Sequence, residues 1–189
     1  MIIAVKDNDR VIVGCSYSEI ITSMEDGDYF NEENMPMAFL EDGKFLVMSS
    51  PFRVSDILIY DDKFLSMEVS PKAIAKDTIP YIRQALQRNS YAISKNGNWN
   101  NAVTYVDGMH IYDIDPFFGF REVDDYVCHG LDVEAVISIM DSTEGLSAED
   151  RIIKAISFAS KVKKWDLFPL VIVDTKTGEI KHVMKEETR

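Results

Sequence analysis

The first sixteen residues read Met1-Ile-Ile-Ala-Val-Lys-Asp-Asn-Asp-Arg-Val-Ile-Val-Gly-Cys-Ser16. Two apolar runs, Met1–Val5 and Val11–Val13, flank a polar turn centred on Asn8-Asp9. Runs rich in β-branched residues and joined by turn residues predict a β-hairpin. Both runs are apolar at nearly every position instead of alternating, so we expect both faces of the hairpin to be buried. A strand that starts at the first residue of a sequence is unusual, because chain ends normally fray.

Composition narrows the class of protein. At 189 residues and 46% hydrophobic residues, residues 1–189 are expected to form a single domain. A net charge of −12 argues against a nucleic-acid backbone or an anionic membrane as partner. No apolar run approaches the roughly 20 residues of a membrane span. We expect no signal peptide, because Lys6, Asp7 and Asp9 interrupt the first apolar stretch. Two distant cysteines suit a reducing compartment, so we expect a cytoplasmic protein.

The rest of the chain alternates between blocks of strands and pairs of helices. Further strands are predicted at Met35–Leu40, Phe45–Met48, Tyr91–Ser94, Ala102–Val106, Met109–Ile114, Tyr126–Cys128, Leu167–Val173 and Glu179–Met184. Helical spacing is found at Val54–Leu65, at Thr78–Arg88 with Pro80 in the first turn, at Val133–Met140, and from a capping box at Ser147 to Val162. Paired helices between blocks of strands predict an α+β fold, a four-layer αββα sandwich of two antiparallel sheets flanked by helix pairs.

Several short segments occur along the chain in an order that resembles a known family of proteins. They are Gly43-Lys-Phe-Leu-Val-Met48, Val103-Thr-Tyr-Val-Asp-Gly108, Ile111-Tyr-Asp-Ile-Asp-Pro116, Tyr126-Val-Cys-His-Gly130 and Leu146-Ser-Ala-Glu-Asp150. Together with the opening hairpin, they resemble the N-terminal-nucleophile (Ntn) hydrolases of the proteasome β-type group, which includes the bacterial ATP-dependent protease ring. The resemblance implies the same sandwich, a homo-oligomer that can close into a ring, and a regulatory ATPase that the sequence does not name.

In that family an N-terminal threonine attacks a carbonyl, and its own α-amine takes the proton. The resemblance places Met1 one residue past the nucleophile, and it puts Ser16 and Pro36 where the family has an aspartate and a lysine. The Gly-Ser-Gly turn of the family becomes Cys128-His129-Gly130, and the late aspartate is retained as Asp166. The family mechanism cannot run on these residues. We therefore expect a non-catalytic structural or binding member of an oligomer, without a cofactor.

The alternative is an active amide or peptide hydrolase of the same class with another nucleophile. Cleavage before Cys15 would create an N-terminal thiol, although it would remove the opening hairpin from the core. His129 could instead meet Ser16 or Asp166 in the old pocket, while its simplest interpretation is a turn histidine hydrogen-bonded to backbone. Cys128 cannot pair with His129, because neighbours on a strand point to opposite faces.

Other candidate sites are weaker. The three histidines lack the spacing of metal ligands. Asp113 and Asp115 lie on one strand face before Pro116, where the resemblance implies an ordinary role in a hairpin, so we assign no metal site. The tryptophans and the aromatic run 117–120 are interpreted as core or subunit interface. A third hypothesis is a binder of a small molecule or peptide between the two sheets.

Overall fold

Two five-stranded antiparallel sheets form the centre of the protein. The computed structural model describes residues 1–16, 21–23, 27–29, 37–40, 43–49, 52–91, 93–99, 101–130, 133–164 and 167–184. The first sheet has the order β10 (Tyr126–His129), β1 (Ile2–Asp7), β2 (Arg10–Ser16), β11 (Leu170–Asp174) and β12 (Ile180–Val183). The second has the order β5 (Met37–Phe39), β6 (Phe45–Ser49), β7 (Ala102–Asp107), β8 (His110–Ile114) and β9 (Phe120–Val123). Strands β3 (Ile21–Ser23) and β4 (Gly27–Tyr29) pair separately.

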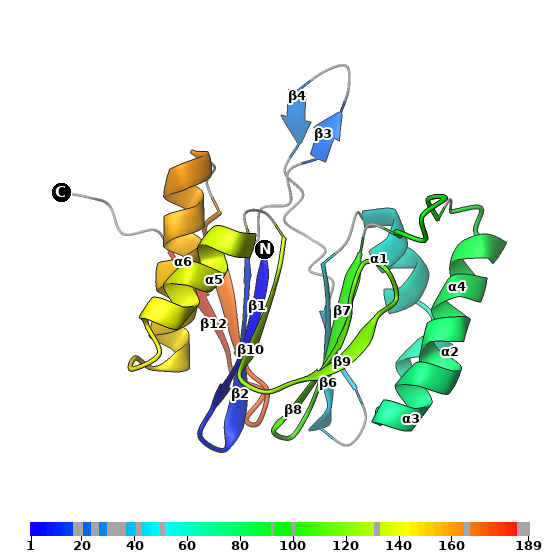
Figure 1. Cartoon of the computed structure of the whole chain (residues 1–189), viewed down its shortest axis with the longest axis horizontal. Helices are drawn as coiled ribbons and strands as arrows, with labels where there is room; N and C mark the ends of the chain where they lie inside the picture. The colour runs from blue at the N-terminus through cyan, green and yellow to red at the C-terminus, as the bar shows by residue number, and fades with distance from the viewer. Residues whose placement is uncertain are drawn as a thin grey trace.

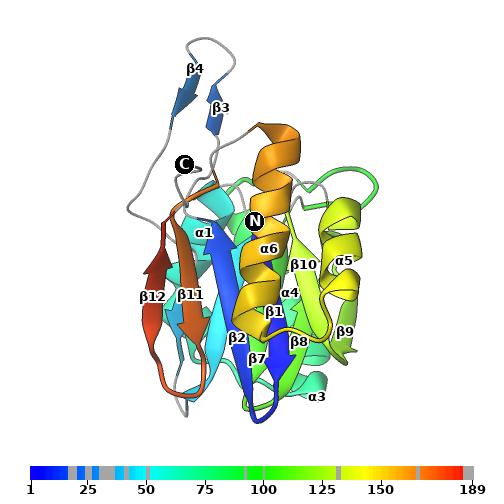
Figure 2. The same ribbon diagram turned by 90° about the vertical axis from the view of Figure 1, so that its left-hand side faces the viewer.

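Helices cover the outer face of each sheet, as Figures 1 and 2 show. The second sheet carries α1 (Phe52–Ile59), α2 (Asp62–Leu65), α3 (Pro71–Ala73), a π-helical segment η2 (Ile74–Thr78) and α4 (Ile79–Arg88). The first sheet carries α5 (Val133–Ser142) and α6 (Ala148–Lys163). The four layers run helix, sheet, sheet, helix, which confirms the predicted αββα sandwich.

Strand β1 contributes to two apolar layers at once. Ile3 and Val5 pack in the cluster under α5 and α6, whereas Ile2 and Ala4 pack in the cluster between the two sheets. Alternate residues of a strand point to opposite faces, so a strand that is buried on both sides must be apolar throughout. The continuous apolar pattern of the opening hairpin is thereby explained, and the prediction that both its faces are buried is confirmed.

A glycine sets the distance between α6 and the first sheet. A Cβ atom built on Gly14 of β2 would lie 2.2 Å from the Cγ2 atom of Ile152 on α6. No side chain fits between the strand and the helix here, so the helix backbone can approach the sheet closely.

Ser147 begins this helix as predicted, because its hydroxyl accepts a hydrogen bond from the backbone N–H of Asp150.

The helices on the second sheet differ from the sequence prediction at two places. The expected helix at Val54–Leu65 is broken in two, because Asp61 caps the start of α2. The predicted helix with Pro80 in its first turn is present as α4, but α3 and the π-helical segment η2 precede it without a break, so helical structure that was not predicted extends back to Pro71. Proline lacks an N–H group and its ring crowds the carbonyl four residues earlier, and the π-helical turn, in which the Ile79 N–H reaches the Ile74 carbonyl, accommodates it.

Three further features differ from the sequence prediction. Tyr91–Ser94 is not a strand among the described residues; the Tyr91 N–H closes the end of α4 on Leu86. Strand β9 is not predicted by the sequence, since its residues alternate irregularly and two of them are exposed. The apolar spacing that runs to Val162 places this residue on the buried face of α6, but Val162 is exposed.

Candidate functional site

The candidate site lies at the end of the sandwich where β1 begins, opposite the turn of the opening hairpin (Figure 1). The Met1 carbonyl accepts a hydrogen bond of 2.8 Å from the Ser16 N–H, which continues the ladder between β1 and β2. The Met1 side chain packs against the apolar cluster under α5 and α6. At this position the chain therefore presents a thioether to an apolar layer and no hydroxyl group.

Gly130, directly after β10, lies against this first residue. Its φ angle is +121°, a conformation that L side chains rarely adopt, and a Cβ atom built on it would lie 3.0 Å from the Met1 Cα atom. These contacts bring Met1 together with Ser16 and with Gly130 at one end of the sandwich. Pro36 and Asp166, the other two candidates, lie outside the described residues.

Ser16 and His129 do not meet as the alternative hypothesis required. The Ser16 hydroxyl donates a hydrogen bond of 3.1 Å to the Leu167 carbonyl. His129 lies on strand β10, not in a turn, and its Nε2 atom is 2.6 Å from the Oδ1 atom of Asp113 on β8. The predicted backbone partner of His129 was therefore wrong: its partner is a carboxylate of the other sheet.

Asp113 is the centre of a polar group that the sequence did not predict. Its side chain is fully buried, at 0% exposure, between the two sheets. Oδ1 also accepts from the Thr104 hydroxyl at 3.4 Å, and Oδ2 accepts from the Arg121 Nε at 3.2 Å. A buried carboxylate needs hydrogen-bond and charge partners, so the acidic residue in the otherwise apolar run Ile111–Ile114 was the available signal.

The two cysteines lie in different layers. Cys15 belongs to the cluster between the sheets, and Cys128 belongs to the cluster under α5 and α6. Burial raises the pKa of each thiol to about 12. Only a thiolate is a strong nucleophile, so neither cysteine is activated in this fold. Cys128 and His129 point to opposite faces, as strand geometry predicts.

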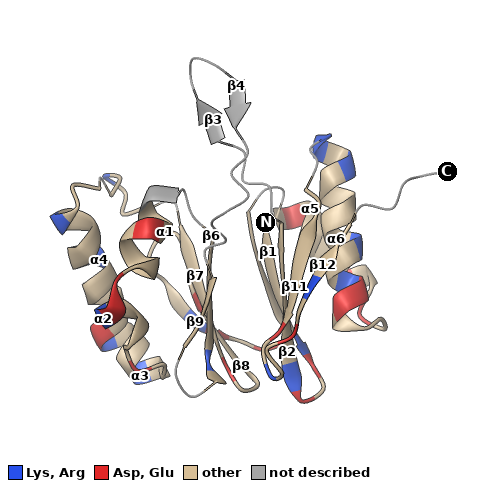
Figure 3. Ribbon diagram, turned by 180° about the vertical axis from the view of Figure 1, so that it is seen from behind, with Lys and Arg blue, Asp and Glu red and all other residues tan. Residues whose placement is uncertain are grey.

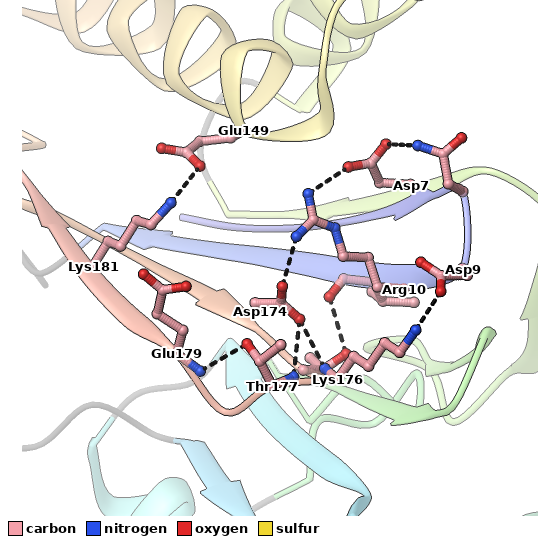
Figure 4. Close-up of polar contacts among 12 residues, drawn as sticks. Asp7, Asp9, Arg10, Glu149, Asp174, Lys176, Thr177, Glu179 and Lys181 are labelled. Carbon is pink, nitrogen blue, oxygen red and sulfur yellow. Dashed lines mark hydrogen bonds and ion pairs between the residues drawn. The ribbon is translucent and has the colours of Figure 1, made fainter.

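A second polar group occupies the opposite end of the first sheet (Figure 4). The Arg10 guanidinium contacts Asp174 at 2.7 Å through one terminal nitrogen and Asp7 at 3.2 Å through the other. Lys176 pairs with Asp9, and Lys181 pairs with Glu149 at 3.2 Å. The contacts of Arg10 and Lys176 join the β1–β2 hairpin to the β11–β12 hairpin, and the contact of Lys181 joins β12 to α6. Here each cation is matched by a carboxylate, which indicates a structural role.

Within the described part of the chain, no group of three or more His, Cys, Asp or Glu residues is arranged to hold a metal ion. None of the described helices is long and apolar enough to cross a membrane. Charged residues lie mainly on the helices and at the turns (Figure 3).

Comparison with solved structures finds proteins whose fold is similar to that of this chain over nearly its whole length. BPH from Thiobacillus denitrificans is 13% identical, with a TM-score of 0.73 over 98% of this chain and 99% of that chain. The same protein has been solved in complex with epoxomicin, at 12% identity and a TM-score of 0.74 over 97% of this chain and 99% of that chain. Anbu (ancestral beta-subunit) from Yersinia bercovieri is 14% identical, with a TM-score of 0.69 over 98% of this chain and 87% of that chain.

No protein-family model matches the sequence, and no curated protein matches it either. Identities this low show the fold alone. The chain has the fold of BPH and Anbu, which agrees with the proteasome-like αββα sandwich expected from its sequence.

Proposed function

We propose that this protein is a proteasome-subunit-like protein without hydrolytic activity, which acts as a structural or binding member of a homo-oligomer. The observation that carries the proposal is the environment of Met1. Its side chain packs into an apolar layer, and its carbonyl is bonded to the Ser16 N–H. Covalent hydrolysis in this class needs a nucleophile next to a base, and this end of the sandwich offers a thioether in that place.

The polar groups nearest to Met1 support the same proposal. The Ser16 hydroxyl donates its hydrogen bond to the Leu167 carbonyl, and the His129 Nε2 atom is hydrogen-bonded to the Asp113 carboxylate. Neither contact directs a base toward a hydroxyl or thiol nucleophile. Both contacts instead join segments that are far apart in the sequence, as structural contacts do.

Hydrolysis through Cys15 is the weaker candidate. Cys15 pairs with Ile2 on one side and with Val171 on the other, in the middle of the first sheet. Cleavage before it would detach β1, which also pairs with β10 over residues 2–5. The apolar contacts of Ile2, Ile3 and Val5 would be lost with the strand, at a cost of about 1.5–3 kcal/mol for each side chain exposed.

The proposed oligomer rests on the neighbours in structure. One of them is the helical assembly of the Anbu complex from Pseudomonas aeruginosa, which is 13% identical with a TM-score of 0.68 over 99% of this chain. A likeness in fold makes a related mode of assembly a reasonable proposal for this chain. We propose a cytoplasmic location along with it, because the two buried cysteines are free thiols.

Two measurements test the proposal. In the first, the purified protein is incubated with epoxomicin and with an electrophilic probe for threonine and cysteine nucleophiles, and its intact mass is recorded. BPH from Thiobacillus denitrificans, treated in parallel, is the positive control for epoxomicin. We expect a mass that retains residues 1–14 and no adduct. An adduct, or a product that begins at Cys15, would contradict the absence of hydrolytic activity.

The second measurement is size-exclusion chromatography with light scattering. We expect a particle mass of at least two chains, each of 21.5 kDa. A monomer at micromolar concentration would contradict the oligomer and leave the absence of hydrolysis standing, so the two parts of the proposal can fail separately.

A further inference from the structure

Among the described residues, Arg121 on β9 is held through its Nε atom alone. Its Nε atom contacts the Oδ2 atom of Asp113 at 3.2 Å, and 63% of its side chain is exposed. No contact of its two terminal amino groups is found among the described residues. An arginine guanidinium carries five N–H donors in a rigid fork, so the donors that match a planar oxyanion remain available at this end of the sandwich.

His129 lies beside this guanidinium. Its Nε2 atom contacts the other oxygen of the same Asp113 carboxylate, and its side chain is 12% exposed. Its second ring nitrogen, Nδ1, has no hydrogen-bond partner in the part of the chain that the structure describes. When the imidazole is protonated, both ring nitrogens are donors. The two cationic groups come from different sheets and share one carboxylate, so they lie side by side.

The charges favour an anion next to this pair. Asp113 supplies one negative charge for two groups that can each carry a positive one. Arg10 shows the contrast, since its two terminal nitrogens each contact a carboxylate. In a protein of net charge −12, an arginine with free terminal donors is an unusual place for an anion to approach.

We propose that Arg121 and His129, oriented by the buried Asp113, form a binding site for a small oxyanion, either a carboxylate or a phosphate group. Asp113 is a positioning residue, because it fixes the two donors and does not itself face the ligand. The site requires no hydrolytic activity and no oligomer, so it stands independently of the proposed function.

The test is an NMR titration of the full chain, with the imidazole signals of its three histidines as reporters. Sodium acetate or sodium phosphate replaces sodium chloride at constant ionic strength, and His129→Gln assigns the signal of His129. For at least one of the two anions, we expect a saturable shift at His129 that is absent at His110 and His182. The anion with the tighter binding identifies the ligand class.

Two substitutions separate the site from general effects of charge. Arg121→Gln is expected to weaken binding about tenfold or more, the effect of losing one charged hydrogen bond. Arg121→Lys keeps the charge without the fork and should weaken binding several-fold. Arg10→Gln removes the same charge elsewhere and should leave the titration unchanged. A far-UV circular dichroism spectrum of each variant confirms that it is folded.

Three results would overturn the proposal. They are shifts that grow linearly with both anions, a folded Arg121→Gln variant that binds as tightly as the original chain, and an Arg10→Gln variant that weakens binding equally.

Discussion

Gly14 makes the packing of α6 on the first sheet sensitive to a single methyl group. In Gly14→Ala the new Cβ would meet the Cγ2 atom of Ile152 at 2.2 Å, so the helix or the strand must shift. We expect a loss of about 1–3 kcal/mol in the free energy of unfolding, which urea denaturation measures. Gly145→Ala is the control, because nothing lies within 4 Å of its added Cβ. Equal stability of the two variants would contradict the close approach.

Tyr105 buries a hydroxyl group that has no hydrogen-bond partner among the residues that the structure describes. Tyr105→Phe removes this group without changing the shape of the ring, so the variant should be as stable as the original chain or up to about 1 kcal/mol more stable. Tyr81→Phe is the matched control. Its hydroxyl donates to Asp61 at 2.7 Å, and its removal should cost about 1 kcal/mol. Thermal unfolding of both variants measures the two changes in stability. A Tyr105→Phe variant that is less stable than the original chain would contradict the prediction.

The two thiols should be inert in the folded protein. Burial raises the pKa of Cys15 and of Cys128 to about 12, so at pH ~8 nearly all of each thiol stays protonated and shielded. With iodoacetamide at that pH, we expect no modification of the native chain and two modifications in denaturant. Mass spectrometry counts them. Rapid labelling of native Cys15 would contradict this prediction and would revive Cys15 as a candidate nucleophile.

At the scale of elements, one carboxylate holds the β11–β12 turn against the opening hairpin. Burial raises the pKa of Asp174, but the N–H groups of Thr177 and Lys176 and the Arg10 guanidinium outweigh it, so the pKa is lowered below 3.8. The charged form is therefore favoured in the folded state. Its contribution is fully present above pH ~4 and is lost as the pH falls through the lowered pKa.

Asp174→Asn is therefore expected to destabilise the chain at pH ~6 and to flatten the acid side of its stability curve. Urea denaturation between pH ~2.5 and ~6 measures this. Asp9→Asn is the control: Lys176 lowers the pKa of Asp9 as well, but the pair is exposed and screened by water, so the curve should barely change. An Asp174→Asn curve parallel to that of the original chain would contradict the assignment.

Elements with a regular apolar period were predictable from the sequence, and irregular ones were not. The opening hairpin, α5 and the capped start of α6 carry their signals locally. Strand β9 has the burial pattern of an edge, with two exposed residues, and its position depends on pairing with β8. The helical stretch from Pro71 to Thr78, which precedes α4, ends in the π-helical turn that accommodates Pro80, and apolar spacing does not reveal such a turn.

At the scale of the whole molecule, the four layers followed from strands that are apolar on both faces. The contacts of the candidate site did not follow. His129 meets Asp113 only because β10 of one sheet lies over β8 of the other, and this alignment depends on how two separately paired sheets stack. Cross-strand neighbours within a sheet can be inferred from a hairpin, whereas contacts between sheets are set by the packing of the complete core.

The place of β1 in the first sheet has a consequence for synthesis on the ribosome. The opening hairpin is made well before its outer neighbours β10 and β11, which lie more than a hundred residues later in the chain. Until those segments emerge, both edges of a strongly apolar hairpin stay unpaired, a state that favours aggregation. The nascent chain therefore has to keep this hairpin from wrong partners while more than a hundred further residues are synthesised.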